Sequence, residues 1–504
     1  MGELPPPAVK SFHRRATWAA VTIIYLALPN VYPHFMSPNE WSRLWLSRAI
    51  LEHQSFRIDS YLRNPSPENV SDVSFFRGHF YSDKAVGMSL AAVPALAVLR
   101  LIAPGASIHT MLFAARFFTV TLPALIALWV LLKRCRSSIG VLVLVGLYLG
   151  SVIFPQALGF TGHLPMTIAI CTAAVLVGRM ELTDARVAIA GSLAGAAILI
   201  DFTSGIAAMG LLIMLAVRAK SIRKVILFGT CCAAIASAQL FVNARCFGGP
   251  LDFAYHHEFN PADQANRAGS FFGIGIPRLE AIWGLTLGRM QGMFVHSPFL
   301  LLAIPAAIAI APGKRDPVRL WAIAMCVAYF YLNSTLTDWV GGWSLGPRYL
   351  TLLYPLLAYL LVDWLECVVP GPWRRYLQPL LLLGVTWSVL LHLAAMLTWS
   401  MPPHWNFLFF PVLELSAYLI LRGAFAPNLL AWSGVPVIVS LGLLVLLALG
   451  VIILNGGRRS VPYVAVATLL FTIAIARAAP SYGSVTATYF ERFLTYMGQS
   501  GAPP

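Results

Sequence analysis

Several stretches of this sequence contain residue types that could do proton-transfer or phosphate chemistry. The first, Pro38-Asn39-Glu40, places a carboxylate just beyond an apolar run, where it could act as a general base for a hydroxyl group. A structural alternative exists, since Asn39 could cap a helix and Glu40 would be favoured in its first turn. Arg43 lies three residues past Glu40 on the same predicted helix face, so we expect it to bind phosphate or orient Glu40.

The second stretch is "GHFYSDKAVG", residues 78–87. Lys84 stands before an apolar segment and could bind a phosphate group at headgroup depth as a compact positive charge. A lysine that snorkels at the end of an apolar segment is the structural alternative. Asp83 offers a second carboxylate, and Tyr81 precedes Lys84 by three residues.

A third stretch, "DWVGGWSLGPRYLTLLYP", covers residues 338–355. Its glycines allow tight turns or the close approach of a ligand. Trp339 and Trp343 offer flat faces that could stack on sugar rings or lie in an interfacial aromatic belt. Arg348 could hold a phosphate through two parallel hydrogen bonds. The density of Asp338, the glycines and Arg348 favours a site over an ordinary belt loop.

Further candidates lie at the ends of other apolar runs. Arg289 and His296 flank one membrane entry in "GLTLGRMQGMFVHSPFLLL", and His163 begins another in "GFTGHLP". Asp201 closes an apolar run, where an ionisable residue is a candidate site residue and a helix cap is the alternative. The histidines permit a divalent metal, but no ligand spacing supports one, so a metal requirement stays open.

The elements that must position these residues are membrane helices. Of the 504 residues, 58% are hydrophobic and 11% are charged, against about 25% charged residues in soluble proteins. Many apolar runs are long enough to span a bilayer, and no alternating barrel pattern is present. The net charge of +15 is spread over short clusters between apolar runs, which indicates topology signals rather than a nucleic-acid partner. We predict an all-α polytopic membrane protein surrounded by membrane lipids.

The basic clusters also predict orientation. Arg14 and Arg15 place the N-terminus in the cytoplasm. The basic loop 133–136 is cytoplasmic only if the apolar segment 85–104 stays on the outer face, and the same reasoning keeps 407–428 there. This gives about 13 transmembrane helices, among them about 109–132, 138–156 and 294–312, with interfacial helices on the outer face.

Three polar loops are expected on the outer face, at 33–84, 244–293 and 335–347. Residues 1–366 are predicted to form the catalytic transmembrane module. Residues 367–504 add C-terminal helices and a short outer tail, with no separate soluble domain.

Together, the pieces "PNEWSRLWLSRAI", "YSDKAVG", "GRMQGMFVHSPFLLL" and "WVGGWSLGPRYLTLLYP" resemble the GT-C superfamily of lipid-linked-sugar glycosyltransferases. The nearest likeness is to bacterial relatives of protein O-mannosyltransferases and lipid A aminoarabinose transferase. The resemblance covers residues 15–355. It implies an enzyme of the bacterial inner membrane that acts on the periplasmic face. The reaction would move a hexose or pentose, with inversion, from polyprenyl phosphate to a hydroxyl of a glycan, lipid or protein.

The resemblance also implies roles for matching residues. Glu40 would be the general base and Lys84 the polyprenyl-phosphate ligand, with Arg43, Arg289 and Arg348 as further phosphate ligands. The first acid of the family's acidic pair is Asn39 here, and an amide does not accept a proton at neutral pH. Asp83 and then Asp338 are the alternative bases. The remaining candidates are expected on the sugar or acceptor side: Asn39, Tyr81, His163, Asp201, His296, Asp338, Trp339 and Trp343.

The competing function is a transporter or flippase for a lipid or small solute. That class predicts internal pseudo-symmetry and ionisable residues in the middle of spans. The sequence shows no repeat of fixed period, and its charges are expected at helix ends. The pattern therefore favours the transferase.

Overall fold

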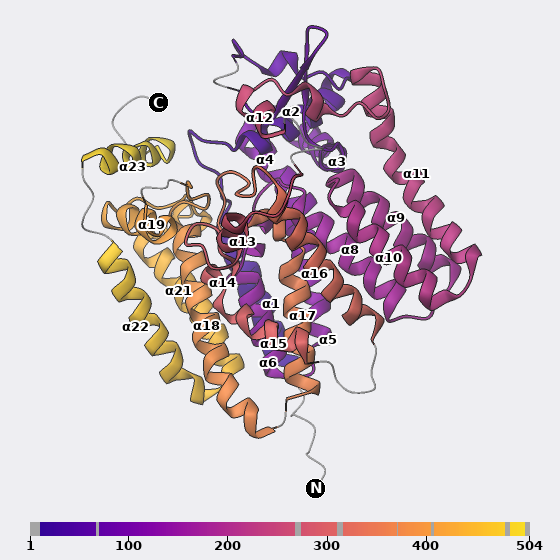
Figure 1. The fold of residues 1–504 in the computed structure, drawn as a ribbon. Helices are drawn as coiled ribbons and strands as arrows, with labels where there is room; N and C mark the ends of the chain where they lie inside the picture. Colours follow the sequence, from indigo (N-terminus) through magenta and orange to yellow (C-terminus); the bar gives the residue numbers. More distant parts are fainter. Residues whose placement is uncertain are drawn as a thin grey trace.

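The computed structural model describes residues 11–66, 70–267, 274–309, 316–369, 371–404, 408–478 and 484–498. Long helices stand side by side, and shorter elements gather at one end of them, at the top of Figure 1. We call this end, which carries α2 (Pro38–His53), the upper end. The opposite end, where α1 (Ser11–Ala27) begins, is the lower end.

The helices that form the body of the bundle run between these two ends. In chain order they are α1, α5 (Leu122–Arg134), α6 (Ser138–Leu149), α8 (His163–Gly178), α9 (Asp184–Ile200), α10 (Ser204–Ala219), α11 (Ile222–Phe247), α15 (Ala303–Ile308), α16 (Pro317–Thr335), α17 (Leu353–Cys367), α18 (Gly371–Leu397), α21 (Val437–Gly456) and α22 (Val461–Ala478).

Shorter elements complete the chain, most of them at or near the upper end. They are α2, β1 (Val73–Phe76), β2 (His79–Ser82), α3 (Gly87–Ile102), α4 (Ile108–Arg116), α7 (Ile153–Ala157), α12 (Pro261–Arg267), α13 (Leu279–Thr286), α14 (Met293–His296), α19 (Pro411–Leu421), α20 (Leu429–Trp432) and α23 (Ser484–Tyr496). A π-helical segment, Phe117–Thr121, joins α4 to α5. The expectation of an all-α chain is wrong at one place, since β1 and β2 form an antiparallel hairpin.

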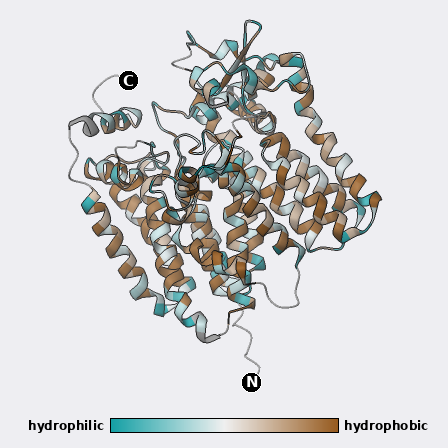
Figure 2. Ribbon diagram, in the orientation of Figure 1, coloured by the Kyte–Doolittle hydropathy of each residue, from teal (hydrophilic) through white to brown (hydrophobic). Residues whose placement is uncertain are grey.

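Within the described ranges, five helices are long and apolar enough to cross a membrane. They are Ile108–Arg134, Ile222–Phe247, Arg375–Leu397, Val437–Gly456 and Arg458–Ala478. Other apolar helices are shorter, and apolar residues run along the bundle in Figure 2 with polar ones toward its ends. The structure is thus a mainly helical membrane protein, and the expected number of about 13 spans stays a prediction.

Two expected spans are broken, for reasons visible in their packing. The expected span 138–156 splits into α6 and α7 at Gly150, where an added Cβ would lie 2.7 Å from Cβ of Ser388 on α18. Glycine permits this close approach. The expected span 294–312 is interrupted at Pro298, where α14 has ended and a 3-10 helix, Pro298–Leu302, precedes α15. Proline removes a helical hydrogen bond and clashes with the preceding turn.

Hydrogen bonds between helix ends show how the chain turns. Arg14 at the start of α1 donates from Nη2 to the carbonyl of Cys135 at 2.8 Å, so the N-terminal basic cluster and the basic loop 133–136 share the lower end. Arg116 of α4 donates to the carbonyl of Pro29, just past α1, at the upper end. The segment 85–104, which lies between α2 and α4, therefore stays at the upper end of the bundle, and its expected place on the outer face of the membrane stays a prediction.

The segment 407–428 behaves in the same way. The amide of Ala426 donates to the carbonyl of Leu397 at the end of α18, at 2.8 Å. Helix α19 lies at the upper end between these points (Figure 1). Asn455, near the end of α21, then donates to Thr17 Oγ1 near the start of α1. The apolar segments 85–104 and 408–428 thus both stay at the upper end, which also carries the polar loops.

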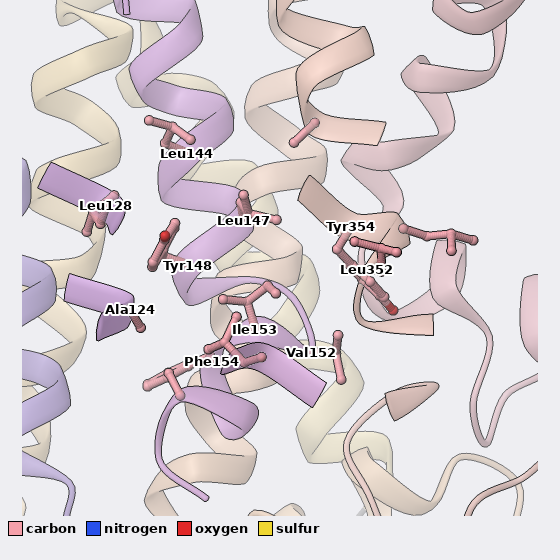
Figure 3. Packing of buried hydrophobic residues seen from close by; sticks show 14 of the residues in the cluster. Ala124, Leu128, Leu144, Leu147, Tyr148, Val152, Ile153, Phe154, Leu352 and Tyr354 are labelled. Carbon is pink, nitrogen blue, oxygen red and sulfur yellow. The ribbon is translucent and has the colours of Figure 1, made fainter. Parts of the chain in front are cut away.

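Helix α6 forms the centre of the hydrophobic core. All of its residues from Gly140 to Leu149 are buried, as expected for a helix that is apolar on every side. Figure 3 shows Leu144, Leu147 and Tyr148 among neighbours from other helices. The Phe154 ring of α7 stacks on Tyr25 of α1 at 5.2 Å between ring centroids. This core fixes the helix ends from which the candidate site is built.

Candidate functional site

The β1–β2 hairpin positions Lys84. Arg77 and Gly78 form its two-residue turn, and both have positive φ angles of 49° and 81°, the geometry that suits a tight hairpin. The chain leaves β2 at Ser82 and presents Asp83 and Lys84 directly afterwards. Lys84 Nζ donates to Asp72 Oδ1 at 2.7 Å and to Asp83 Oδ2 at 2.6 Å. The hairpin and its flanks therefore hold a buried cation between two carboxylates.

Both sides of this ion pair stay charged. Burial lowers the pKa of Lys84, but the charges of Asp72 and Asp83 outweigh burial and leave that pKa raised. Burial raises the pKa of Asp72, whereas Lys84, Arg348 and Arg43 act in the opposite direction and leave it lowered. Three cations thus act on one carboxylate, which places Arg43 and Arg348 in the electrostatic surroundings of Lys84.

Helix α2 contributes Arg43 and packs its N-terminal half against the hairpin. Ser42 Oγ lies 2.6 Å from Ser82 Oγ of β2, and Ser89 of α3 donates to the carbonyl of Arg43 at 3.0 Å. Arg43 is 5% exposed, and burial lowers its pKa despite the nearby carboxylates. The burial of a guanidinium in this position keeps a positive charge beside Lys84 rather than in solvent.

Arg43 does not orient Glu40, contrary to the expectation from their spacing. Arg43 Nη1 donates to Asn39 Oδ1 and, at 3.0 Å, to the Asn39 carbonyl. The relevant spacing on α2 is therefore four residues rather than three. Asn39 is buried and its side-chain oxygen is held by the cation.

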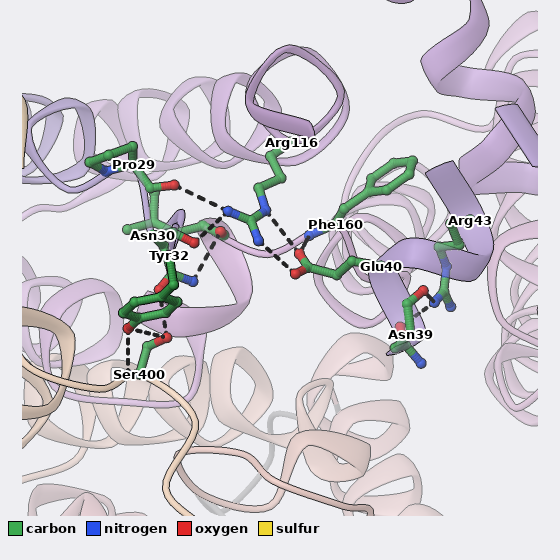
Figure 4. A network of polar contacts seen from close by, with 10 residues as sticks. Pro29, Asn30, Tyr32, Asn39, Glu40, Arg43, Arg116, Phe160 and Ser400 are labelled. Carbon is green, nitrogen blue, oxygen red and sulfur yellow. Dashed lines mark hydrogen bonds and ion pairs between the residues drawn. The ribbon is translucent and has the colours of Figure 1, made fainter. Parts of the chain in front are cut away.

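Glu40 instead pairs with Arg116 of α4, as Figure 4 shows. Arg116 Nε donates to Oε1 at 2.9 Å and Nη2 to Oε2 at 2.6 Å, and both side chains are 4% exposed. The amide of Phe160 also donates to Oε1 at 2.6 Å. Arg116 further donates to the carbonyls of Pro29 and Asn30. Glu40 thus joins α2 to α4, the end of α1 and the turn that precedes α8.

That turn leads directly to His163, the first residue of α8. His163 Nδ1 lies 2.9 Å from Asp201 Oδ2. The other oxygen of Asp201 accepts from the amide and hydroxyl of Thr203, at 3.1 and 2.8 Å. The His163 ring packs edge-on against Tyr349 at 5.6 Å, and the charges of Arg348 and Arg43 act on it. His163 and Asp201 are therefore brought together beside two of the expected phosphate ligands.

The late glycine-rich loop presents Arg348. Gly341, Gly342 and Gly346 all have positive φ angles, which only glycine adopts without strain. The amide of Gly341 donates to Asp338 Oδ1 at 3.1 Å. Arg348 lies over the Tyr349 ring at 5.5 Å and forms no ion pair with a carboxylate among the described residues. The loop therefore delivers a guanidinium to the surroundings of Lys84 and His163.

Other predicted residues lie elsewhere. Trp339 is buried against α13, where a Cβ on Gly284 would lie 2.1 Å from its ring, so it offers no face to a sugar. Trp343 stacks near Phe35 in an aromatic cluster at the upper end. The Arg289 guanidinium lies 4.1 Å from the centre of the Phe409 ring.

His296 and Tyr81 also have structural surroundings. His296 is fully buried, with Nε2 3.4 Å from the Arg289 carbonyl and its ring 6.2 Å from His392. Tyr81 packs against Phe247 at 5.3 Å. Tyr81 nevertheless lines a pocket with Asp83 and Lys84, and most of its remaining wall is apolar, with Leu46 of α2 and Val242 and Phe247 of α11 among its residues. This pocket gives Lys84 an apolar neighbourhood.

Sequence reasoning missed Arg116 and Asp72, the ionic partners of Glu40 and Lys84. Arg116 lies within the predicted span near 109–132, so the expectation that charges gather at helix ends is wrong there. An arginine inside an apolar run was itself a signal of a functional or paired residue. Across the described ranges, no group of three or more His, Cys, Asp or Glu side chains is arranged to hold a metal ion.

The chain was compared with known proteins. No family model and no curated protein matches it. Its structure is similar to that of ArnT from Cupriavidus metallidurans bound to undecaprenyl phosphate, with a TM-score of 0.50 and 15% identity over 93% of this chain and 77% of that one. The apo structure of ArnT gives a TM-score of 0.49 and 16% identity over 92% and 75%. The chain therefore has a fold like that of ArnT, which agrees at the level of fold with the resemblance seen in the sequence.

Proposed function

We propose that this chain is an integral membrane glycosyltransferase that moves a sugar from a polyprenyl-phosphate donor to an acceptor hydroxyl. The reaction would take place at the periplasmic face of a bacterial inner membrane. One observation carries the proposal. At the upper end of the bundle, Lys84 donates to Asp72 and Asp83, and the charges of Arg43 and Arg348 also act on Asp72. The fold is like that of ArnT, whose structure was solved with undecaprenyl phosphate bound.

The three cations suit a lipid phosphate. Lys84 supplies a compact charge, and the two arginines supply planar donors for phosphate oxygens. The pocket beside Lys84 is mostly apolar, as the first isoprene units of a polyprenyl chain require. The Arg289 guanidinium packs over the Phe409 ring, so we do not assign it to the phosphate site.

The proposed reaction is a displacement at the anomeric carbon with inversion. The acceptor oxygen forms the new bond, and the bond to the phosphate oxygen breaks with its electron pair. Lys84, Arg43 and Arg348 would offset the charge that develops on the departing polyprenyl phosphate. Neither a nucleotide nor a metal enters this scheme as a required component.

We assign Glu40 a positioning role in place of its expected role as general base. Proton uptake by Glu40 would break a buried bidentate ion pair with Arg116 and weaken the bond from Phe160. Retained as a charged pair, Glu40 holds the turn before His163 against α2. Asp83 accepts a hydrogen bond from Lys84, and Asp338 accepts one from the Gly341 amide. We therefore do not assign either carboxylate as the general base.

The experiment measures release of polyprenyl phosphate by the purified chain in nanodiscs. The donors are a panel of synthetic short-chain polyprenyl-phosphate hexoses and pentoses, and Lys133→Ala at the lower end is the matched basic-residue control. We expect release in the wild type and in Lys133→Ala, and strong loss in Lys84→Ala. Absence of both release and polyprenyl-phosphate binding in the wild type would overturn the proposal.

A further inference from the structure

We infer that His163, oriented by Asp201, is the general base that takes the proton from the acceptor hydroxyl. This inference rests on the proposed glycosyltransferase function and deepens it. The residue that replaces the first acid of the family's pair, Asn39, is an amide and does not accept a proton. The chain therefore needs a proton acceptor near its cations, and the two turns at the upper ends of α8 and α9 supply one.

The hydrogen bonds around Asp201 determine which ring nitrogen carries the proton. Asp201 Oδ1 accepts two hydrogen bonds from Thr203, which fixes the plane of the carboxylate. Oδ2 lies 2.9 Å from His163 Nδ1, so a carboxylate there accepts the Nδ1–H bond. This leaves the lone pair of the neutral imidazole on Nε2. The hydrogen bond of the His163 ring to Asp201 is made through Nδ1, and the side chain retains 13% exposure.

Close backbone packing holds the pair in place. An added Cβ on Gly162 would lie 2.8 Å from the carbonyl of Ile200, so the start of α8 and the end of α9 approach more closely than a larger residue allows. Phe160, three residues before His163, is bound through its amide to Glu40. The Glu40–Arg116 ion pair therefore helps to determine where His163 lies, although it does not contact it.

The charges that face His163 favour a neutral resting ring. Burial lowers the pKa of His163, the hydrogen bond and charge of Asp201 raise it, and the charges of Arg348 and Arg43 lower it again. The net pKa is lowered. The Tyr349 ring packs against His163 in a T-shaped arrangement. A neutral imidazole at neutral pH is the form that can accept a proton, and the carboxylate of Asp201 stabilises the imidazolium that results.

The proton balance is simple. As the acceptor oxygen bonds to the anomeric carbon, its proton moves to Nε2 of His163. The bond between the anomeric carbon and the phosphate oxygen breaks, and both electrons leave with polyprenyl phosphate. Arg348 packs over Tyr349, whose ring contacts His163, and its charge acts on both His163 and Asp72, the partner of Lys84. We therefore place the base and the phosphate ligands at one site. His163 then returns its proton to water.

The first test uses His163→Gln and Asp201→Asn, with His79→Gln as a matched histidine control on the hairpin. We expect His163→Gln to lose about a hundred-fold to ten-thousand-fold in the rate of polyprenyl-phosphate release while binding a short-chain polyprenyl phosphate like the wild type. The acid limb of the wild-type pH–rate profile should vanish in His163→Gln. In Asp201→Asn, where the orienting charge is gone, it should move to lower pH.

A purely structural histidine would give a different result. Equal loss of release, binding and thermal stability in His163→Gln, together with an unchanged pH profile, would overturn the inference. So would wild-type release in His163→Gln. Failure of the wild type to bind any polyprenyl phosphate is a separate result and contradicts the proposed function instead.

A second test needs no substrate. The ¹⁵N chemical shifts of histidine-labelled protein report which ring nitrogen carries the proton, and subtraction of the His163→Gln spectrum assigns His163. We expect Nδ1 protonated and Nε2 bare at pH 7. A ring that carries its proton on Nε2 at that pH overturns the inference, whatever the activity of the chain.

Discussion

Arg116 donates to both carboxylate oxygens of Glu40, at 2.9 and 2.6 Å, across 76 residues of sequence. The ion pair is buried and is extended by the amide of Phe160 and by two carbonyls beyond α1. It thus joins four segments of the upper end: α2, α4, the end of α1 and the turn before α8. Its removal should alter both the stability of the chain and the position of His163.

Glu40→Gln should lower the free energy of unfolding by about 3–5 kcal/mol, because it leaves the Arg116 charge buried without a counter-ion. The matched control is Glu52→Gln, which removes the partly exposed pair with Arg48 and should cost about 0–1 kcal/mol. Intrinsic-fluorescence melting in nanodiscs measures both. Equal melting temperatures for the two variants would contradict a structural role for the Glu40 pair.

The double variant Glu40→Gln/Arg116→Gln separates position from proton transfer. With both charges gone, we expect stability above that of either single variant, since no buried charge is left unpaired. Release of polyprenyl phosphate should recover in part with stability. A double variant that is stable yet as inactive as Glu40→Gln would return Glu40 to the role of general base.

Lys84→Ala and Arg348→Ala should each weaken binding of polyprenyl phosphate by about ten- to a hundred-fold, since each removes a charge-assisted contact worth about 1.5–3 kcal/mol. Lys133→Ala, at the lower end, should bind like the wild type. Titration with fluorescent short-chain polyprenyl phosphate gives the affinities. Unchanged affinity in both upper-end variants would remove these residues from the phosphate site.

Affinity for a polyprenyl-phosphate sugar should stay flat between pH 6 and pH 9. The folded pKa of Lys84 is raised above its usual 10.5. Its stabilising charge is therefore fully present below that unfolded value and is lost only as pH rises through the folded pKa. Asp72, with a lowered pKa, contributes above its unfolded value and loses its contribution only as pH falls through the folded one. An affinity that falls with a midpoint between pH 7 and pH 9 would show that Lys84 deprotonates there.

Orientation in the membrane is tested by cysteine labelling. In a chain stripped of its seven native cysteines, Ser107→Cys should react with an impermeant reagent from outside intact cells, and Arg136→Cys only after permeabilisation. Both positions are exposed, and the structure places the loops that carry them at opposite ends. Labelling of Arg136→Cys alone from outside would reverse the assignment of the upper end to the periplasm.

Much of the architecture followed from the sequence because helix ends carry readable signals. The basic clusters predicted that the N-terminus and the loop 133–136 share one face, and the bond from Arg14 to Cys135 places both at the lower end. The expected place of 85–104 and 407–428 on the outer face stays a prediction. The same topology placed His163 and Asp201 at a common end, although it did not pair them. The aromatic pairs Phe75-Phe76 and Phe80-Tyr81 on either side of Arg77-Gly78 were a hairpin signal that an all-helical interpretation overlooked.

The remaining features depend on contacts that no local pattern encodes. Glu40 and Lys84 were both recognised, but their partners Arg116 and Asp72 are set by tertiary packing. The burial of Trp339 could not be predicted from the sequence either, because it depends on contact with Gly284 of a separate helix. Residue type predicted where charge and aromatic surface occur, and packing decided which of these face the site.

The central claim is that Lys84, Arg43 and Arg348 form the binding site of a polyprenyl phosphate. A cryo-electron microscopy structure of the chain in nanodiscs with added undecaprenyl phosphate tests it most directly. We predict density for the phosphate within hydrogen-bond distance of Lys84 Nζ and of at least one of the two guanidinium groups, with the isoprene chain entering the apolar pocket beside Tyr81. Lipid density whose phosphate lies away from all three cations would contradict the account.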